Sequence, residues 1–110
     1  MSHAPRKVER RRGPRYVVFR DCSIDLKGTR VAVTLLNISK HGLATLGPEM
    51  SVAPGDRIKV DIQGLAPGLE IVVVNVSFGR IGAEFDLTPE RAAIWTEEFA
   101  QLTVGLAPLK

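Results

Sequence analysis

Residues 36–43 read Leu-Asn-Ile-Ser-Lys-His-Gly-Leu, a polar stretch between two apolar runs, Val31–Leu36 and Leu43–Leu46. Both runs are rich in Val and Leu, so each predicts a short buried strand. An ordinary two-residue hairpin would need only Asn-Gly or Gly-Xaa between such strands. The longer polar stretch therefore indicates a turn that carries more than chain reversal.

Three side chains of this turn define a candidate site. Asn37 and Ser39 are two residues apart, and in an extended chain both project from the same face. Gly42 removes a side chain and lets backbone or ligand approach closely. Together they predict a small shelf of hydrogen-bond donors and acceptors. The alternative is a longer turn in which Asn37 and Ser39 bond only their own backbone.

Working outward from this stretch, turn signals separate six β-prone runs. Gly13-Pro14, Lys27-Gly28, Gly47-Pro48 and Pro54-Gly55-Asp56 interrupt the apolar pattern, as do residues 64–68 and Gly79-Arg80. The fifth run is apolar enough to predict burial on both faces, whereas the fourth alternates and predicts a half-buried strand. The predicted strands are Tyr16–Leu26, Thr29–Leu36, Gly42–Leu46, residues 57–63, Ile71–Val76 and Ile81–Phe85.

The last predicted element is a helix over about residues 89–103. Thr88 is a good N-cap, Pro89 suits the first helical position, and Glu90 complements the positive end of the helix. One apolar stripe follows at helical spacing, and we expect it to pack the helix onto the strands rather than to stack on a ligand. Its members are Ala92, Trp95, Phe99 and Leu102.

Six short strands followed by one helix predict a mainly all-β fold, a small antiparallel barrel with a C-terminal helix. With 110 residues, the chain suffices for one domain, which we place at 15–110 behind a flexible basic arm over 1–14. No stretch approaches the roughly 18 apolar residues of a membrane helix, no apolar segment of a secretory signal is present, and Cys22 is the only cysteine. We therefore expect a cytoplasmic protein.

Charge is unevenly distributed along the chain. Residues 1–20 hold seven Lys or Arg and one acid, whereas residues 21–110 hold eight bases and eleven acids. A basic arm on a mildly acidic body predicts an anionic partner: a nucleotide, a nucleic acid or an acidic lipid. Arg11 and Arg15 lie four apart at the start of the first strand, and guanidinium groups bind phosphates and guanine edges in a bidentate manner.

Arg-x-x-x-Arg before the first strand and Asn-x-Ser-x-x-Gly after the second resemble the two motifs of the PilZ domain, a family of bacterial receptors for cyclic di-GMP. Pro54-Gly55-Asp56 and residues 82–85, Gly-Ala-Glu-Phe, are similar to later features of that family. The resemblance implies a six-stranded barrel that binds cyclic di-GMP at its surface, with the arginine motif folding over the ligand. It implies no cofactor, no catalysis and a downstream protein partner.

The same resemblance implies the site residues. Arg11 and Arg15 match the arginine motif, while Asn37, Ser39 and Gly42 match the second motif. Many members carry Asp at the position of Asn37, and an amide oxygen accepts hydrogen bonds more weakly than a carboxylate. Three further candidates for ligand contact flank these motifs, namely Arg10, Arg12 and His41.

Two other functions remain open at this stage. A small barrel with a basic arm also suits oligonucleotides, although aromatic residues make up only 5% of the chain and no aromatic ladder follows a strand. An adaptor of the same fold that binds no ligand is the other alternative. Glu84 and Asp86 share a strand face, but no nucleophile accompanies them, so we expect no enzyme. His3, His41 and Cys22 are too scattered for a zinc site.

Overall fold

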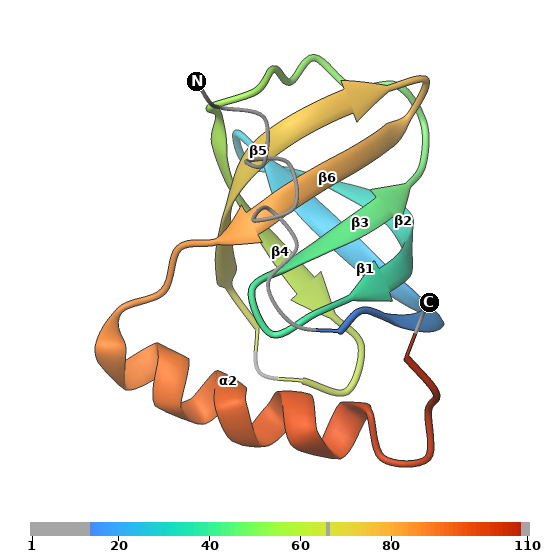
Figure 1. The fold of residues 1–110 in the computed structure, drawn as a ribbon. Helices are drawn as coiled ribbons and strands as arrows, with labels where there is room; N and C mark the ends of the chain where they lie inside the picture. Colours follow the sequence, from blue (N-terminus) through green and yellow to red (C-terminus); the bar gives the residue numbers. More distant parts are fainter. Residues whose placement is uncertain (1–13, 66, 109–110) are drawn as a thin grey trace, which may run out of the picture.

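The computed structural model describes residues 14–65 and 67–108. In chain order the elements are β1 (Tyr16–Leu26), β2 (Thr29–Ile38), β3 (Gly42–Leu46), β4 (Arg57–Ile62), β5 (Leu69–Ser77), β6 (Arg80–Phe85) and α2 (Pro89–Leu102). The six strands close into a barrel in the order β1-β2-β3-β6-β5-β4, with every neighbouring pair antiparallel (Figure 1). The predicted all-β barrel with a C-terminal helix is confirmed.

Alternating apolar residues explain why these strands close around one core. In β4, Ile58, Val60 and Ile62 are buried, while Arg57 and Lys59 between them are exposed. Burying one face of a pleated strand in this way stabilises the sheet only when the other strands also turn their apolar side inward. Fully buried side chains from all six strands do so, among them Ile24, Leu35, Leu43, Val60, Ile71 and Ile81.

The prediction that β5 is buried on both faces is wrong. Leu69, Ile71 and Val73 face the core, but the side chain of Val74 is 41% exposed and Asn75 is exposed. The register between β5 and β6 shifts between Val73 and Asn75, which is a β-bulge that leaves Val74 without a partner on β6. The continuous valine run therefore reflects a locally bulged, half-buried strand and not a central buried one.

The helix α2 lies across one end of the barrel, next to the turn between β2 and β3 (Figure 1). Thr88 caps it as predicted, since its side chain accepts a hydrogen bond from the backbone N–H of Arg91. Trp95 and Leu102 of the predicted apolar stripe are buried, and the Trp95 ring packs 4.8 Å from that of Phe85 at the end of β6. The helix therefore covers the core, in agreement with the sequence prediction.

Candidate functional site

Asn37 belongs to β2, not to the turn that follows it. It pairs with Val17 of β1 on one side and with Ala44 of β3 on the other. The predicted second strand ended at Leu36, two residues before the observed end at Ile38. The amide of Asn37 is held by this pairing on the outside of the barrel wall, where the residue is 9% exposed.

The side chains of Arg15 and Asn37 meet directly. Arg15 Nη1 donates a hydrogen bond of 2.7 Å to Asn37 Oδ1, across 22 residues of sequence. Arg15 stands immediately before β1, and β1 pairs with β2, so strand pairing alone brings the two motifs to the same place. A guanidinium carries five N–H donors in a planar fork, so this group can bind several acceptors at once.

Ser39 organises the turn between β2 and β3. Its side chain is 4% exposed, and Oγ accepts from the backbone N–H groups of His41 (3.2 Å) and Gly42 (3.1 Å) while donating to the Gly42 carbonyl (3.3 Å). The Ser39 N–H also donates to that carbonyl, at 2.8 Å. The hydroxyl therefore bonds the backbone of its own turn, so the alternative that the sequence left open holds for Ser39 but not for Asn37, which accepts from Arg15.

Gly42 is required by the neighbouring strand. A Cβ added at this position would lie 2.4 Å from the carbonyl oxygen of Ala83 in β6, a distance that side chains do not tolerate. Gly42 pairs with Glu84 of β6 in the sheet register. The glycine thus lets the turn lie close against β6, and the close approach expected from sequence is one of backbone to backbone.

Two carbonyl groups tie this turn to the rest of the molecule. Trp95 Nε1 on α2 donates to the carbonyl of Lys40 at 3.0 Å, and the N–H of Phe85 donates to the carbonyl of His41 at 2.9 Å. The sequence predicts only a packing role for Trp95 and not this contact. No pattern in the sequence pairs an indole N–H with a turn carbonyl 55 residues away.

The candidates divide according to where the structure places them. Asn37, Ser39 and Gly42 lie together at the β2–β3 junction, with Arg15 in contact with Asn37. His41 is exposed at the tip of the turn. Arg10, Arg11 and Arg12 lie outside the described residues, as does nearly all of the predicted arm.

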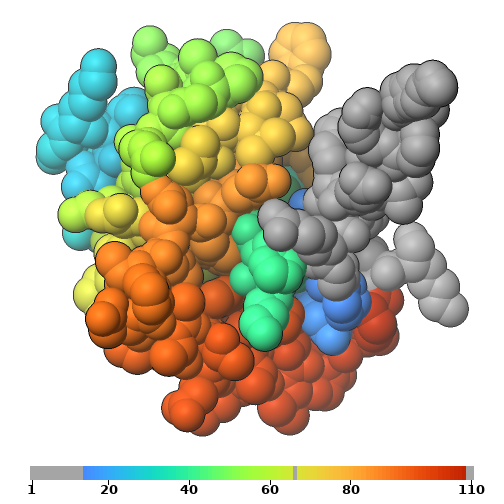
Figure 2. All heavy atoms as spheres, turned by 60° about the vertical axis from the view of Figure 1, so that its left-hand side comes forward, coloured from blue at the N-terminus to red at the C-terminus, as the bar shows by residue number. Residues whose placement is uncertain are grey.

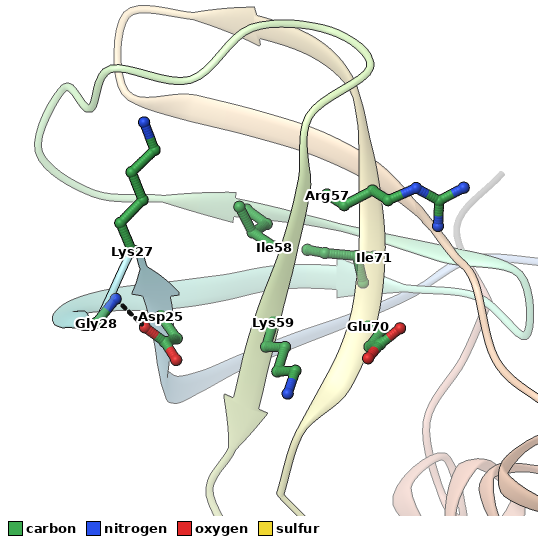
Figure 3. A pocket seen from close by; sticks show the side chains of 8 residues that line it. All are labelled: Asp25, Lys27, Gly28, Arg57, Ile58, Lys59, Glu70 and Ile71. Carbon is green, nitrogen blue, oxygen red and sulfur yellow. Dashed lines mark hydrogen bonds between the residues drawn. The ribbon is translucent and has the colours of Figure 1, made fainter.

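A hollow lies away from the motif residues, among β4, β5 and the turn after β1 (Figure 3). Its volume is about 350 Å³, and its charged residues are Asp25, Lys27, Arg57, Lys59 and Glu70. Lys59 is the register neighbour of both Asp25 and Glu70 on the adjacent strands, so opposite charges lie side by side across the sheet there. The labelled basic side chains point in different directions and do not converge on one ligand position.

Over the described residues, no cluster of His, Cys, Asp and Glu could hold a metal ion. Within the same part of the chain, no helix is both long and apolar enough to cross a bilayer.

The protein is a small closed β-barrel with one capping helix. An arginine and an asparagine are hydrogen-bonded to each other at the barrel wall. A sequence model of the PilZ domain matches residues 9–100, and the chain therefore belongs to the PilZ domain family. No curated protein matches the chain with significant similarity.

Two solved structures share the fold. YcgR from Escherichia coli, crystallised in complex with c-di-GMP, superposes with a TM-score of 0.65 at 19% identity, over 86% of this chain and 46% of that one. The Bacillus subtilis inhibitor of motility, MotI/DgrA, superposes with a TM-score of 0.62 at 16% identity, over 86% and 52%. The present chain thus spans about half the length of these two proteins.

Proposed function

We propose that this chain is a receptor module for cyclic di-GMP, with its binding site at the junction of β1, β2 and β3. The observation that carries the proposal is the 2.7 Å hydrogen bond between Arg15 and Asn37, which joins the two motifs at one point of the barrel wall. Membership of the PilZ family and the ligand named for the YcgR structure support the choice of ligand.

The chemistry of the site suits a cyclic dinucleotide. Arg15 offers a planar, permanently charged fork that binds a phosphate or the O6/N7 edge of guanine. The Asn37 amide can both donate and accept at a base edge. In this proposal Ser39 and Gly42 act on the ligand chiefly by fixing the turn on which Asn37 is presented, because the Ser39 hydroxyl is already bonded to backbone.

Signalling in this proposal is an order–disorder switch and not catalysis. Cyclic di-GMP brings Arg11 and the rest of the 1–14 arm onto the barrel, and charge-assisted contacts offset the entropy lost by the arm. The arm and ligand together form a new surface for a downstream protein in the cytoplasm. Arg10, Arg12 and His41 are further candidates for contact.

Titration calorimetry with cyclic di-GMP tests the proposal. The wild type should bind in the nanomolar to micromolar range, and Arg15→Ala should lose about 1.5–3 kcal/mol, as expected for hydrogen bonds to a charged group. Arg30→Ala is the matched control, because Arg30 is an exposed arginine that pairs with Asp61 away from the motif residues. Absence of heat at millimolar ligand, or equal losses in the two variants, would contradict the proposed function.

A further inference from the structure

We propose that Glu84 of β6 reads a guanine base in the hollow between the β2–β3 turn and α2, and so determines the specificity of the site. This inference rests on the proposed function and adds to it a residue outside both motifs. It concerns one base of the ligand and a residue of β6, whereas Arg15 stands before β1 and Asn37 belongs to β2.

The hollow is a feature of the fold next to the motif turn. Its volume is about 240 Å³, and it is lined by Lys40 and His41 of the turn, Glu84 and Phe85 of β6, and Trp95 of α2. Figure 2 shows the teal segment around residue 40 beside the orange segment that contains β6 and above the red helix. Pockets that enclose a drug-sized ligand measure about 300–1,000 Å³, so this smaller hollow suits one base rather than a whole dinucleotide.

Gly42 leaves the Glu84 side chain a clear path toward the turn. Gly42 is the partner of Glu84 on β3, and neighbouring strands lie about 4.8 Å apart. Since Gly42 has no side chain, nothing on β3 separates the Glu84 carboxylate from the edge of the turn. Asn37 and Glu84 are thereby presented on the same outer wall, on strands separated only by β3.

The Glu84 carboxylate has no partner within the described residues. No hydrogen bond or ion pair joins it to any of them, although it is exposed on a strand next to a lysine-bearing turn. Elsewhere on the strands and loops, Asp61 binds Arg30 and Asp86 binds Arg57, whereas Glu70, like Glu84, forms no ion pair with a described residue. An unpaired acid in a hollow beside a motif for an anionic ligand needs a reason other than the fold, since it adds repulsion toward phosphate.

Guanine supplies that reason. Its N1–H and N2–H₂ groups are adjacent donors, and a carboxylate accepts both at once with its two oxygens, in charge-assisted hydrogen bonds. Adenine has an acceptor at N1 and cannot make this pair, so the carboxylate would be left unpaired against it. The full negative charge at Glu84 also supplies the strong acceptor that the neutral amide of Asn37 lacks. Lys40 at the rim of the hollow offsets repulsion of the ligand phosphates.

The test compares Glu84→Gln with Glu70→Gln, each titrated with cyclic di-GMP and with cyclic di-AMP. Glu70 is an exposed glutamate on β5 that lines the other hollow, which makes it the matched control. We expect Glu84→Gln to lose on the order of 10- to 100-fold in affinity for cyclic di-GMP, in line with loss of a charged hydrogen bond, and to bind cyclic di-AMP unchanged or more tightly. Glu70→Gln should behave like the wild type.

A fluorescence titration gives a second readout. Trp95 is the only tryptophan of the chain and lines the hollow, so a base that enters there should change its emission in the wild type and less so in Glu84→Gln. Unchanged or tighter cyclic di-GMP binding by Glu84→Gln would overturn the inference, and Arg15→Ala would still weaken binding if the proposed function holds. A wild type that does not bind cyclic di-GMP would overturn both together.

Discussion

At the scale of single residues, the members of the motif Asn-x-Ser-x-x-Gly have two different roles: the asparagine presents its amide, and the serine and glycine hold the turn. Asn37 offers its amide at the barrel wall and already accepts from Arg15. Ser39 and Gly42 instead shape the backbone around it, one through hydrogen bonds to the turn and the other through its close approach to Ala83. Short signature motifs can therefore contain residues whose loss affects a ligand only through the loop.

We expect Ser39→Ala to destabilise the fold by about 1–3 kcal/mol, because a buried hydroxyl with three backbone contacts is lost and two N–H groups lose their acceptor. Urea unfolding followed by circular dichroism measures the change. Ser51→Ala is the control, since Ser51 is exposed in the loop before β4. Equal midpoints for the two variants would show that the hydroxyl does not hold the turn.

The sequence could predict which residues cluster at this junction but not what each one contacts. Spacing placed Asn37 and Ser39 on one face, yet Ser39 lies past the end of β2, where the alternation of side chains stops. The glycine at position 42 predicts that another group approaches the backbone closely. Only the pairing of β3 with β6 shows that this group is the Ala83 carbonyl. Contacts between segments far apart in sequence depend on strand order, which periodicity does not encode.

At the scale of elements, the sequence predicts those features of turns and helix ends that depend only on neighbouring residues. The Lys27-Gly28 turn, the Thr88 cap and the end of the helix near residue 103 follow from residue type alone. Bulges were not predictable. The register shift at Val74 bends β5, as β-bulges do, and so helps the barrel to close. The consecutive valines around it are equally typical of a fully buried strand, so the sequence does not reveal the bulge.

Helix α2 and the β2–β3 turn should behave as one energetic unit. Trp95→Phe keeps most of the packing against Phe85 but removes the donor to the Lys40 carbonyl, and we expect a loss of about 1–3 kcal/mol. Combined with Ser39→Ala, the two losses should be non-additive by at least about 0.5 kcal/mol, as for residues in one contact network. Leu102→Ala, at the far end of α2, should be additive with Ser39→Ala in the same urea measurement.

The β5–β6 hairpin carries an unfavourable residue at its tip. Phe78 and Gly79 form a two-residue loop with φ of 48° and 82°, a conformation that favours Asn-Gly, and the Phe78 side chain is 89% exposed. Phe78→Asn should stabilise the fold by about 1 kcal/mol, because a bulky side chain is disfavoured at positive φ and almost no buried area is lost. Calorimetry should show a rise of about 4–8 °C in Tm. Phe78→Ala tests the cause, since alanine removes the aromatic ring without tolerating positive φ and should give no comparable gain.

At the scale of the whole molecule, the barrel is closed by pairing between β1 and β4, and β1 pairs with β2 on its other side. Cys22 lies in that strand between Val33 of β2 and Ile62 of β4, and its side chain is 8% exposed. Burial raises the pKa of the Cys22 thiol from its ordinary 9.0 to about 12, and the charge of Asp21 adds to the shift. A thiol of this kind is inert while the barrel is closed.

This pKa makes the stability of the barrel sensitive to alkali. Below pH 9.0 the thiol is protonated in both the folded and the unfolded chain, so its contribution is fully present. Between pH 9.0 and about 12 the unfolded chain ionises first, and the free energy of unfolding should fall by up to about 1.4 kcal/mol per pH unit. Urea unfolding across this range should show the fall in the wild type and a shallower one in Cys22→Ala, which lacks the thiol. Parallel pH profiles would mean that folding does not raise the pKa of this thiol. Rapid thiol labelling of the native protein at pH 8 would mean that β1 detaches from its neighbours without global unfolding.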